Sequence, residues 1–151
     1  MNITEKAEVV TWPETYYVFI EKAGPISTNA GAAWQTAHSL VPELLEHNKI
    51  TAYLSLYKMD PQVYRAGFAL EAPPVELPKA LNYEKFPGGK YSKFEYTGPY
   101  SGLGEATGRL VRIVNETEIP LRDDFNIEHY VTDPRVTPEP ESITAILFPT
   151  V

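Results

Sequence analysis

The sequence predicts an α+β fold made of two similar halves, each with the order strand, helix, strand, strand. Three observations predict it. In some segments apolar residues recur with the period of two that is typical of strands, and in others with the period near 3.6 that is typical of helices. Proline and glycine separate these segments. Finally, the stretch WPETYYVFIEKAGPIS at residues 12–27 resembles FPGGKYSKFEYTGPYS at residues 86–101, 74 positions further along.

The repeat keeps a consistent register. At an offset of 74, seven of the 20 positions from 13 to 32 are identical, where roughly one or two identities are expected by chance. The identical pairs are Pro13/Pro87, Tyr17/Tyr91, Glu21/Glu95, Gly24/Gly98, Pro25/Pro99, Ser27/Ser101 and Ala32/Ala106. After the first helix the offset becomes 73, so that Tyr57 matches Tyr130.

The register predicts how the chain is organised. We expect a single domain over residues 1–151, with one repeat at 8–72, a proline-rich connector at 73–80 and a second repeat at 81–151. The two halves would form a mainly antiparallel sheet with the two main helices on one face. A pseudo-twofold seam between such halves is a natural place for a ligand cleft.

The first half has clear local signals. Residues 15–21 are rich in β-branched and aromatic side chains and predict a strand. Apolar residues at helical spacing predict a helix over 29–47, and Pro42 within it should kink or split that helix. The alternating segment 50–58 predicts a half-buried strand, and 63–70 predicts another.

The second half repeats this order. Strands are expected at residues 90–97, 124–132 and 142–148. A helix with Ser101 as its cap should follow the first of these strands. Its expected apolar stripe consists of Leu103, Ala106, Leu110, Val111 and Val114.

Composition excludes several classes of protein. The chain has no cysteine and a net charge of −7 without a basic cluster, so disulfides and a nucleic-acid surface are not expected. No apolar run reaches the length of a membrane helix, and no signal-peptide pattern is present, which favours a cytoplasmic protein. His38, His47 and His129 form no metal-binding motif, so we expect neither a metal nor another cofactor.

The strand expected near residue 128 carries the candidate site. Alternation places Glu128 and Tyr130 on one face, and the more apolar Ile127 and His129 on the other. The apolar set is expected to face the helices, which leaves Glu128 on the opposite face. The repeat register matches Ser55 with Glu128.

Tyr53 and Tyr57 lie on the same face of the matching strand as Ser55. If the two strands meet near the pseudo-axis, Glu128 would lie among these tyrosines and Tyr130, a site suited to an aromatic or cationic ligand. The alternative, which stays open at this point, is an ordinary solvated sheet face that carries one glutamate.

Two motifs resemble those of a known family. KFEYTGPYSGL at residues 93–103 and IEHYVTDPRVTPEPESITAILFPTV at residues 127–151 resemble the GyrI-like small-molecule-binding domain. This is the effector-binding domain of AraC-type and multidrug-responsive bacterial regulators. The resemblance covers nearly the whole chain, and it implies two strand–helix–strand–strand halves with a ligand cleft between them.

The resemblance also implies roles for individual residues. In multidrug-binding members, the motif glutamate contacts lipophilic cations and aromatic neighbours stack around them; in this sequence that glutamate is Glu128, and Tyr130 is the motif tyrosine. Further ligand contacts, placed by approximate alignment, are Tyr53, Tyr57, Phe68 and Tyr100. The chain departs from the regulators because no helix-turn-helix precedes the domain, so we expect a stand-alone form.

Three functions are compatible with these features. The first is a stand-alone protein that binds lipophilic, aromatic small molecules, cations included, through Glu128 and the tyrosines. The second, implied by stand-alone members of the family, is a hydrolase of cyclopropane-type electrophiles that uses Glu128 and a tyrosine for catalysis. The third is a protein-binding module like the gyrase-inhibitory relatives, with an unidentified partner.

Overall fold

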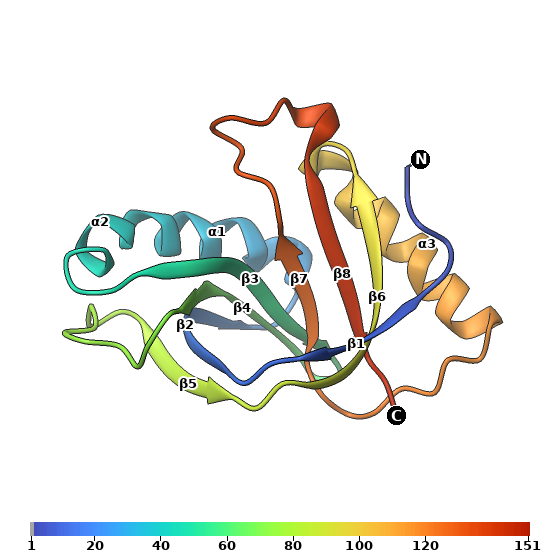
Figure 1. Cartoon of the computed structure of the whole chain (residues 1–151), viewed down its shortest axis with the longest axis horizontal. Coiled ribbons are helices and arrows are strands. Elements are labelled where there is room, and N and C mark those ends of the chain that lie inside the picture. The colour runs from blue at the N-terminus through green and yellow to red at the C-terminus, as the bar shows by residue number, and fades with distance from the viewer. Residues whose placement is uncertain (1) are drawn as a thin grey trace. The chain divides into compact units, whose positions relative to one another are not determined.

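The computed structural model describes residues 2–151 and confirms an α+β fold (Figure 1). The chain forms two compact units. We call residues 13–88 the N-unit, and residues 1–12 together with 89–151 the C-unit. Within the described range, no helix is both long enough and apolar enough to cross a membrane.

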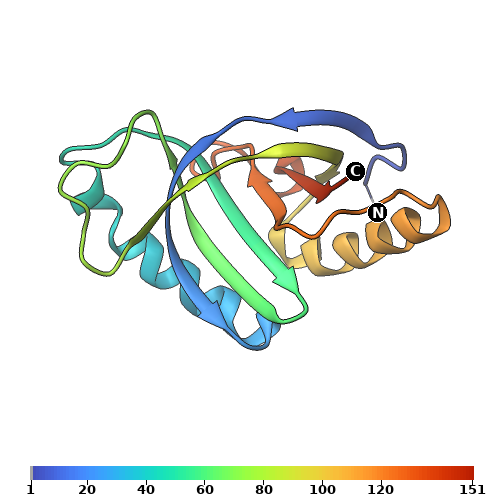
Figure 2. The same ribbon diagram turned by 90° about the horizontal axis from the view of Figure 1, so that it is seen from below.

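The N-unit contains a four-stranded antiparallel sheet. Its strands are β2 (Thr15–Ala23), β3 (Ile50–Met59), β4 (Gln62–Leu70) and β5 (Asn82–Phe86). They lie in the order β3-β4-β2-β5, so β4 lies between β3 and β2 (Figure 2). Gly67 is required at the centre of β4, because a Cβ atom there would lie 2.1 Å from the Val18 carbonyl oxygen.

Pro42 divides the first helical segment in two, as predicted. Helix α1 (Ile26–Ser39) ends before the proline, and the short α2 (Val41–Leu44) has the proline in its first turn, where no amide donor is needed. Helix α1 packs on β2 and β4. Its buried residues Ala33 and Ala37 are small, which lets the helix approach the sheet closely.

Strand β3 is more deeply buried than its alternation predicts. Leu54 and Leu56 have no exposed surface, although they point away from the face on which Ser55 and Tyr57 lie. Residues 54–57 are all buried, so the expectation of a half-buried strand is wrong for this part of β3. Both faces of the sheet exclude water here, and apolarity therefore does not identify the face that α1 covers.

The C-unit contains the other four strands. They are β1 (Glu8–Trp12), β6 (Gly89–Thr97), β7 (Asn126–Tyr130) and β8 (Ile143–Pro149), in the antiparallel order β1-β6-β8-β7. Two short 3-10 helices, η1 (Tyr100–Gly102) and η2 (Glu139–Glu141), lie in the connections. Helix α3 (Leu103–Glu116) packs along β6 (Figure 1).

Helix α3 covers one face of this sheet. Its buried residues Ala106, Leu110 and Val114 form a core with aromatic and aliphatic side chains of β6 and β8. Two details differ from the sequence-based expectation. Val111 is 41% exposed and lies outside this core. Ser101 does not cap the helix with a hydrogen bond, because it belongs to η1 and helix α3 begins only after Gly102.

Strands β1 and β5 were not predicted from the sequence. Strand β1 pairs only with β6 and strand β5 only with β2 among the strand pairs within each unit. Such edge strands need one apolar face at most, so EVVTW and NYEKF show no strong alternation of their own. Their conformation depends on the neighbouring strand that supplies hydrogen bonds.

Candidate functional site

Glu128 lies at the centre of β7, on the face of the C-unit sheet that α3 covers. Its Cα pairs with that of Ile146, a residue of the core beneath α3. Directly paired residues of antiparallel strands point to the same face. The expectation that Glu128 lies opposite the helix is therefore wrong. Ile127, on the other face, is also fully buried, so the more apolar face was not a guide to the position of the helix.

Burial controls the chemistry of this carboxyl group. Glu128 is only 9% exposed, and desolvation raises its pKa from 4.5 to about 7. The Tyr130 hydroxyl donates a hydrogen bond to Oε1 over 3.1 Å, which opposes part of that rise in pKa. Among the described residues, no lysine, arginine or histidine forms an ion pair with Glu128. The group is thus a buried carboxyl that titrates near neutral pH.

Tyr130 connects Glu128 to the loop before α3. The ring of Tyr100 meets that of Tyr130 edge to face, with centroids 5.7 Å apart, and Tyr100 itself is 42% exposed. Tyr96 fixes this loop, because its hydroxyl donates to the Pro99 carbonyl oxygen over 2.8 Å. Gly102 must lack a side chain, because a Cβ atom there would lie 2.3 Å from the Tyr96 hydroxyl oxygen.

Two threonines at this site were not identified from the sequence. Thr107 lies on α3 and faces Glu128, and its hydroxyl contributes to lowering the pKa of the carboxyl group. The Thr107 and Glu128 oxygens nevertheless do not reach the geometry of a full hydrogen bond. Thr144 lies on β8 directly opposite Tyr130. Helical spacing from Leu103 and alternation with Ile146 are the sequence signals that could have revealed them.

The N-unit has a buried polar group at the matching position. Ser55 pairs with Ala66 of the core beneath α1, so it also points toward its helix. The Trp34 indole nitrogen donates to Ser55 Oγ over 3.0 Å and to the Tyr64 hydroxyl over 2.8 Å. Ser55 and Tyr64 share a further hydrogen bond of 2.6 Å. The repeat register predicts the match between Ser55 and Glu128, whereas the role of Trp34 was not predicted from the sequence.

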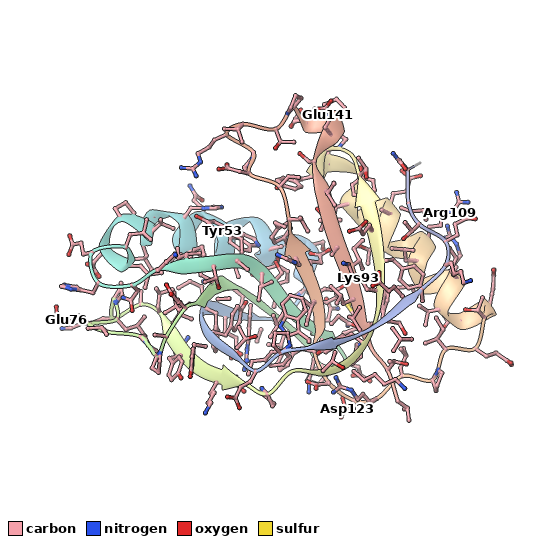
Figure 3. The ribbon with its side chains drawn as sticks, in the orientation of Figure 1. Tyr53, Glu76, Lys93, Arg109, Asp123 and Glu141 are labelled. Carbon is pink, nitrogen blue, oxygen red and sulfur yellow. The ribbon has the colours of Figure 1, made fainter. Side chains whose placement is uncertain are left out.

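The three predicted ligand contacts of the N-unit lie near this network. Phe68 is fully buried and Tyr57 is 7% exposed, whereas Tyr53, which is labelled in Figure 3, is half-buried. Tyr53 and Trp34 are parallel within 8°, with ring centroids 6.4 Å apart. Phe68 stands at 79° to Trp34 and at 83° to Tyr53. Tyr57 stacks on Tyr64.

Each unit therefore assembles three of the six predicted site residues. The C-unit brings together Glu128, Tyr130 and Tyr100, and the N-unit brings together Tyr53, Phe68 and Tyr57. No group of three or more potential metal ligands occurs within residues 2–151. The functional groups of the two clusters are a carboxyl group with a pKa of about 7, several hydroxyl groups and aromatic rings.

The sequence matches the model of a known family over almost its full length. The family is GyrI-like, described as the GyrI-like small molecule binding domain, and the match spans residues 5–151. The chain belongs to this family and is a GyrI-like small-molecule-binding domain. A comparison with the curated proteins gives no match.

Several solved structures share the fold. The C-terminal domain of EcmrR is 16% identical, with a TM-score of 0.81 over 100% of this chain and 99% of that one. SAV2435, solved bound to tetraphenylphosphonium, is 14% identical, with a TM-score of 0.78 over 97% of this chain and 94% of that one. A hydrolase from Listeria innocua is 11% identical, with a TM-score of 0.60 over 98% and 93%.

Proposed function

We propose that this protein binds lipophilic organic cations and that Glu128 is the group that recognises their charge. The observation that carries the proposal is the 9% exposed carboxyl group without a cationic partner among the described residues. An ionised carboxylate in such a place is costly unless a positive charge accompanies it. A bound cation would supply that charge, and the fold is shared with SAV2435, which was solved with tetraphenylphosphonium.

Aromatic residues are the other proposed ligand contacts. Tyr130 holds the carboxyl group through its hydroxyl, and Tyr100 offers a partly exposed ring beside it. Tyr53, Tyr57 and Phe68 are proposed ligand contacts within the N-unit, and Tyr53 has the most exposed surface of these three. Each ring face that meets a cation would strengthen binding by about 0.5–2 kcal/mol.

The proposed function predicts a specific dependence on pH. The cation binds the ionised form of Glu128, and the pKa of Glu128 in the ligand-free protein is about 7. Affinity should therefore reach a plateau above pH 8 and fall about tenfold for each pH unit below 7. Binding should be independent of pH if Glu128 does not contact the charge.

The test is calorimetric titration with tetraphenylphosphonium at pH 6.0, 7.0 and 8.5. Glu128→Gln should weaken binding at pH 8.5 by tenfold or more and remove the pH dependence. Neutral triphenylphosphine oxide should bind both proteins equally. Glu105→Gln, which removes an exposed carboxylate from α3, is the matched control and should behave as wild type. Equal affinity of wild type and Glu128→Gln at pH 8.5 would contradict the proposal.

A second candidate function rests on the pKa of the same group. A carboxyl group with a pKa of about 7 is suited to general acid–base catalysis at neutral pH. Glu128 would then accept a proton from the water molecule whose oxygen bonds to a ring carbon of the cyclopropane, while the adjacent ring C–C bond breaks and a tyrosine hydroxyl protonates the carbon that takes its electron pair. Incorporation of ¹⁸O from labelled water into a cyclopropane-containing substrate, lost in Glu128→Gln, would support this function, and no incorporation across a panel of electrophiles would exclude it.

A further inference from the structure

The core beneath α3 contains two hydroxyl groups with unused hydrogen-bonding capacity. Thr107 Oγ1 and Thr144 Oγ1 are both buried, and neither has a hydrogen-bond partner within the described part of the chain. Thr144 has no exposed surface at all. Most buried hydroxyl groups in proteins are paired, because burial without a partner costs free energy. Two such hydroxyl groups in one small region are therefore candidates for hydrogen bonds to a ligand.

Both hydroxyl groups belong to the Glu128 site. Thr107 reaches Glu128 from α3. Thr144 pairs with Tyr130 across the β7–β8 ladder, and Ile146 pairs with Glu128, so Thr144 lies diagonally opposite the carboxyl group on the same face of the sheet. The site thus has a carboxyl group approached from the helix and from the neighbouring strand by hydroxyls that lack partners.

The number of acceptors indicates what the site can hold. Tyr130 donates to Oε1 of Glu128, and each oxygen of a carboxylate can accept more than one hydrogen bond. Each threonine hydroxyl has two acceptor lone pairs. The carboxylate and the two hydroxyl groups offer acceptors from three elements, β7, α3 and β8. A primary ammonium group has three N–H donors, whereas a quaternary ammonium or phosphonium centre has none.

We infer that Thr107, Thr144 and Glu128 select cations that carry N–H donors, so that primary aryl-alkylammonium ligands bind more tightly than quaternary cations of the same shape. This inference rests on the proposed function, because it specifies the head group of the cation that the site recognises. A site built to hydrogen-bond a ligand rejects an analogue without those donors, because its buried polar groups then stay unpaired. Tetraphenylphosphonium would be bound by charge and ring contacts alone.

The experiment compares two probes that differ only in the head group. They are 3-(2-naphthyl)propylammonium and its N,N,N-trimethyl derivative, titrated by calorimetry at pH 8.0, where a primary alkylamine with a pKa of about 10.4 stays protonated. Wild type should bind the primary ammonium at least tenfold more tightly. Thr144→Val and Thr107→Val, which keep the side-chain shape and remove the hydroxyl, should each reduce this ratio to about threefold or less. Affinity for the trimethyl probe should change less than threefold.

The ratio of the two affinities is the decisive quantity. Substitutions that alter the ionisation of Glu128 affect both cations equally, so they cancel in the ratio. Thr144→Ser keeps the hydroxyl and should therefore keep the preference. Thr36→Val, at an exposed position on α1, is the control that should leave the preference unchanged. Thermal melts of each variant establish that it is folded.

The outcomes separate the two proposals. Equal binding of both probes by wild type, or tighter binding of the trimethyl probe, would overturn the inference and leave cation binding intact. A preference that persists in the Thr107→Val and Thr144→Val variants would also overturn it, since the hydroxyls would not be its source. If neither probe nor tetraphenylphosphonium binds, the proposed function fails, and the inference fails with it.

Discussion

Replacing Glu128 by glutamine should stabilise the protein at high pH and have little effect at low pH. Glutamine keeps the size of the side chain and an oxygen that accepts the Tyr130 hydrogen bond, but it never ionises. In wild type, burial raises the pKa of Glu128 from 4.5 to about 7. The folded protein therefore retains a proton on this group in the pH range in which the unfolded chain releases it.

The sign and size of the effect follow from this difference in pKa. Below pH 4.5 both states hold the proton, and the carboxyl group has no cost. Between pH 4.5 and 7 the folded state binds more protons than the unfolded state, so stability falls as pH rises. Above about pH 7 the loss is complete. At about 1.4 kcal/mol for each pH unit of the difference, it amounts to about 3 kcal/mol.

The assay is urea denaturation of wild type, Glu128→Gln and the control Glu105→Gln at pH 4.0, 5.5, 7.0 and 8.5. The free energy of unfolding of Glu128→Gln minus that of wild type should grow from near zero at pH 4.0 to about 3 kcal/mol at pH 8.5. Taking this difference cancels the titration of every other group. Glu105→Gln should show no such growth, because its side chain is exposed. A difference that is constant with pH, or that is largest at pH 4.0, would show that the pKa of Glu128 is not raised by folding.

Two further predictions concern the residues that position Glu128. Tyr130→Phe removes a hydrogen bond that lowers the pKa of Glu128, so the carboxyl group should titrate at a higher pH. This is measurable by ¹³C NMR of the carboxyl carbon, and an unchanged midpoint would show that the phenol does not stabilise the carboxylate. Gly102→Ala places a Cβ atom 2.3 Å from the Tyr96 hydroxyl oxygen and should destabilise the protein by about 1–3 kcal/mol. In a Tyr96→Phe background that oxygen is absent, so urea denaturation should give a smaller cost; equal costs in both backgrounds would contradict the steric explanation.

The duplicated halves show how one position can serve two purposes. Ser55 and Glu128 match in the repeat, and each points toward the helix of its own unit. In the N-unit, hydrogen bonds with Trp34 and Tyr64 satisfy Ser55. In the C-unit the matching position carries a carboxyl group beside two hydroxyls without partners. The first arrangement is a closed polar network, and the second retains capacity for a ligand.

Elements with strong local signals could be predicted from the residues alone. These include β2, the division of the first helix at Pro42 and the two-residue spacing that places Glu128 and Tyr130 on one face of β7. Each depends on backbone geometry and on neighbours within a few residues. The internal repeat likewise follows from residue identities alone. The edge strands β1 and β5 were missed because their pairing partners, and not their own residues, determine their conformation.

The face of β7 that the helix covers, and the pKa of Glu128, depend on tertiary packing and could not be predicted from the residues alone. Ile127 and Glu128 are both buried although they lie on opposite faces, so the polarity of the strand could not distinguish the two faces. The pKa of Glu128 depends on desolvation and on Thr107, a residue 21 positions earlier in the chain. Alternation and motifs report which residues share a face; the removal of water from that face is a property of the packed structure.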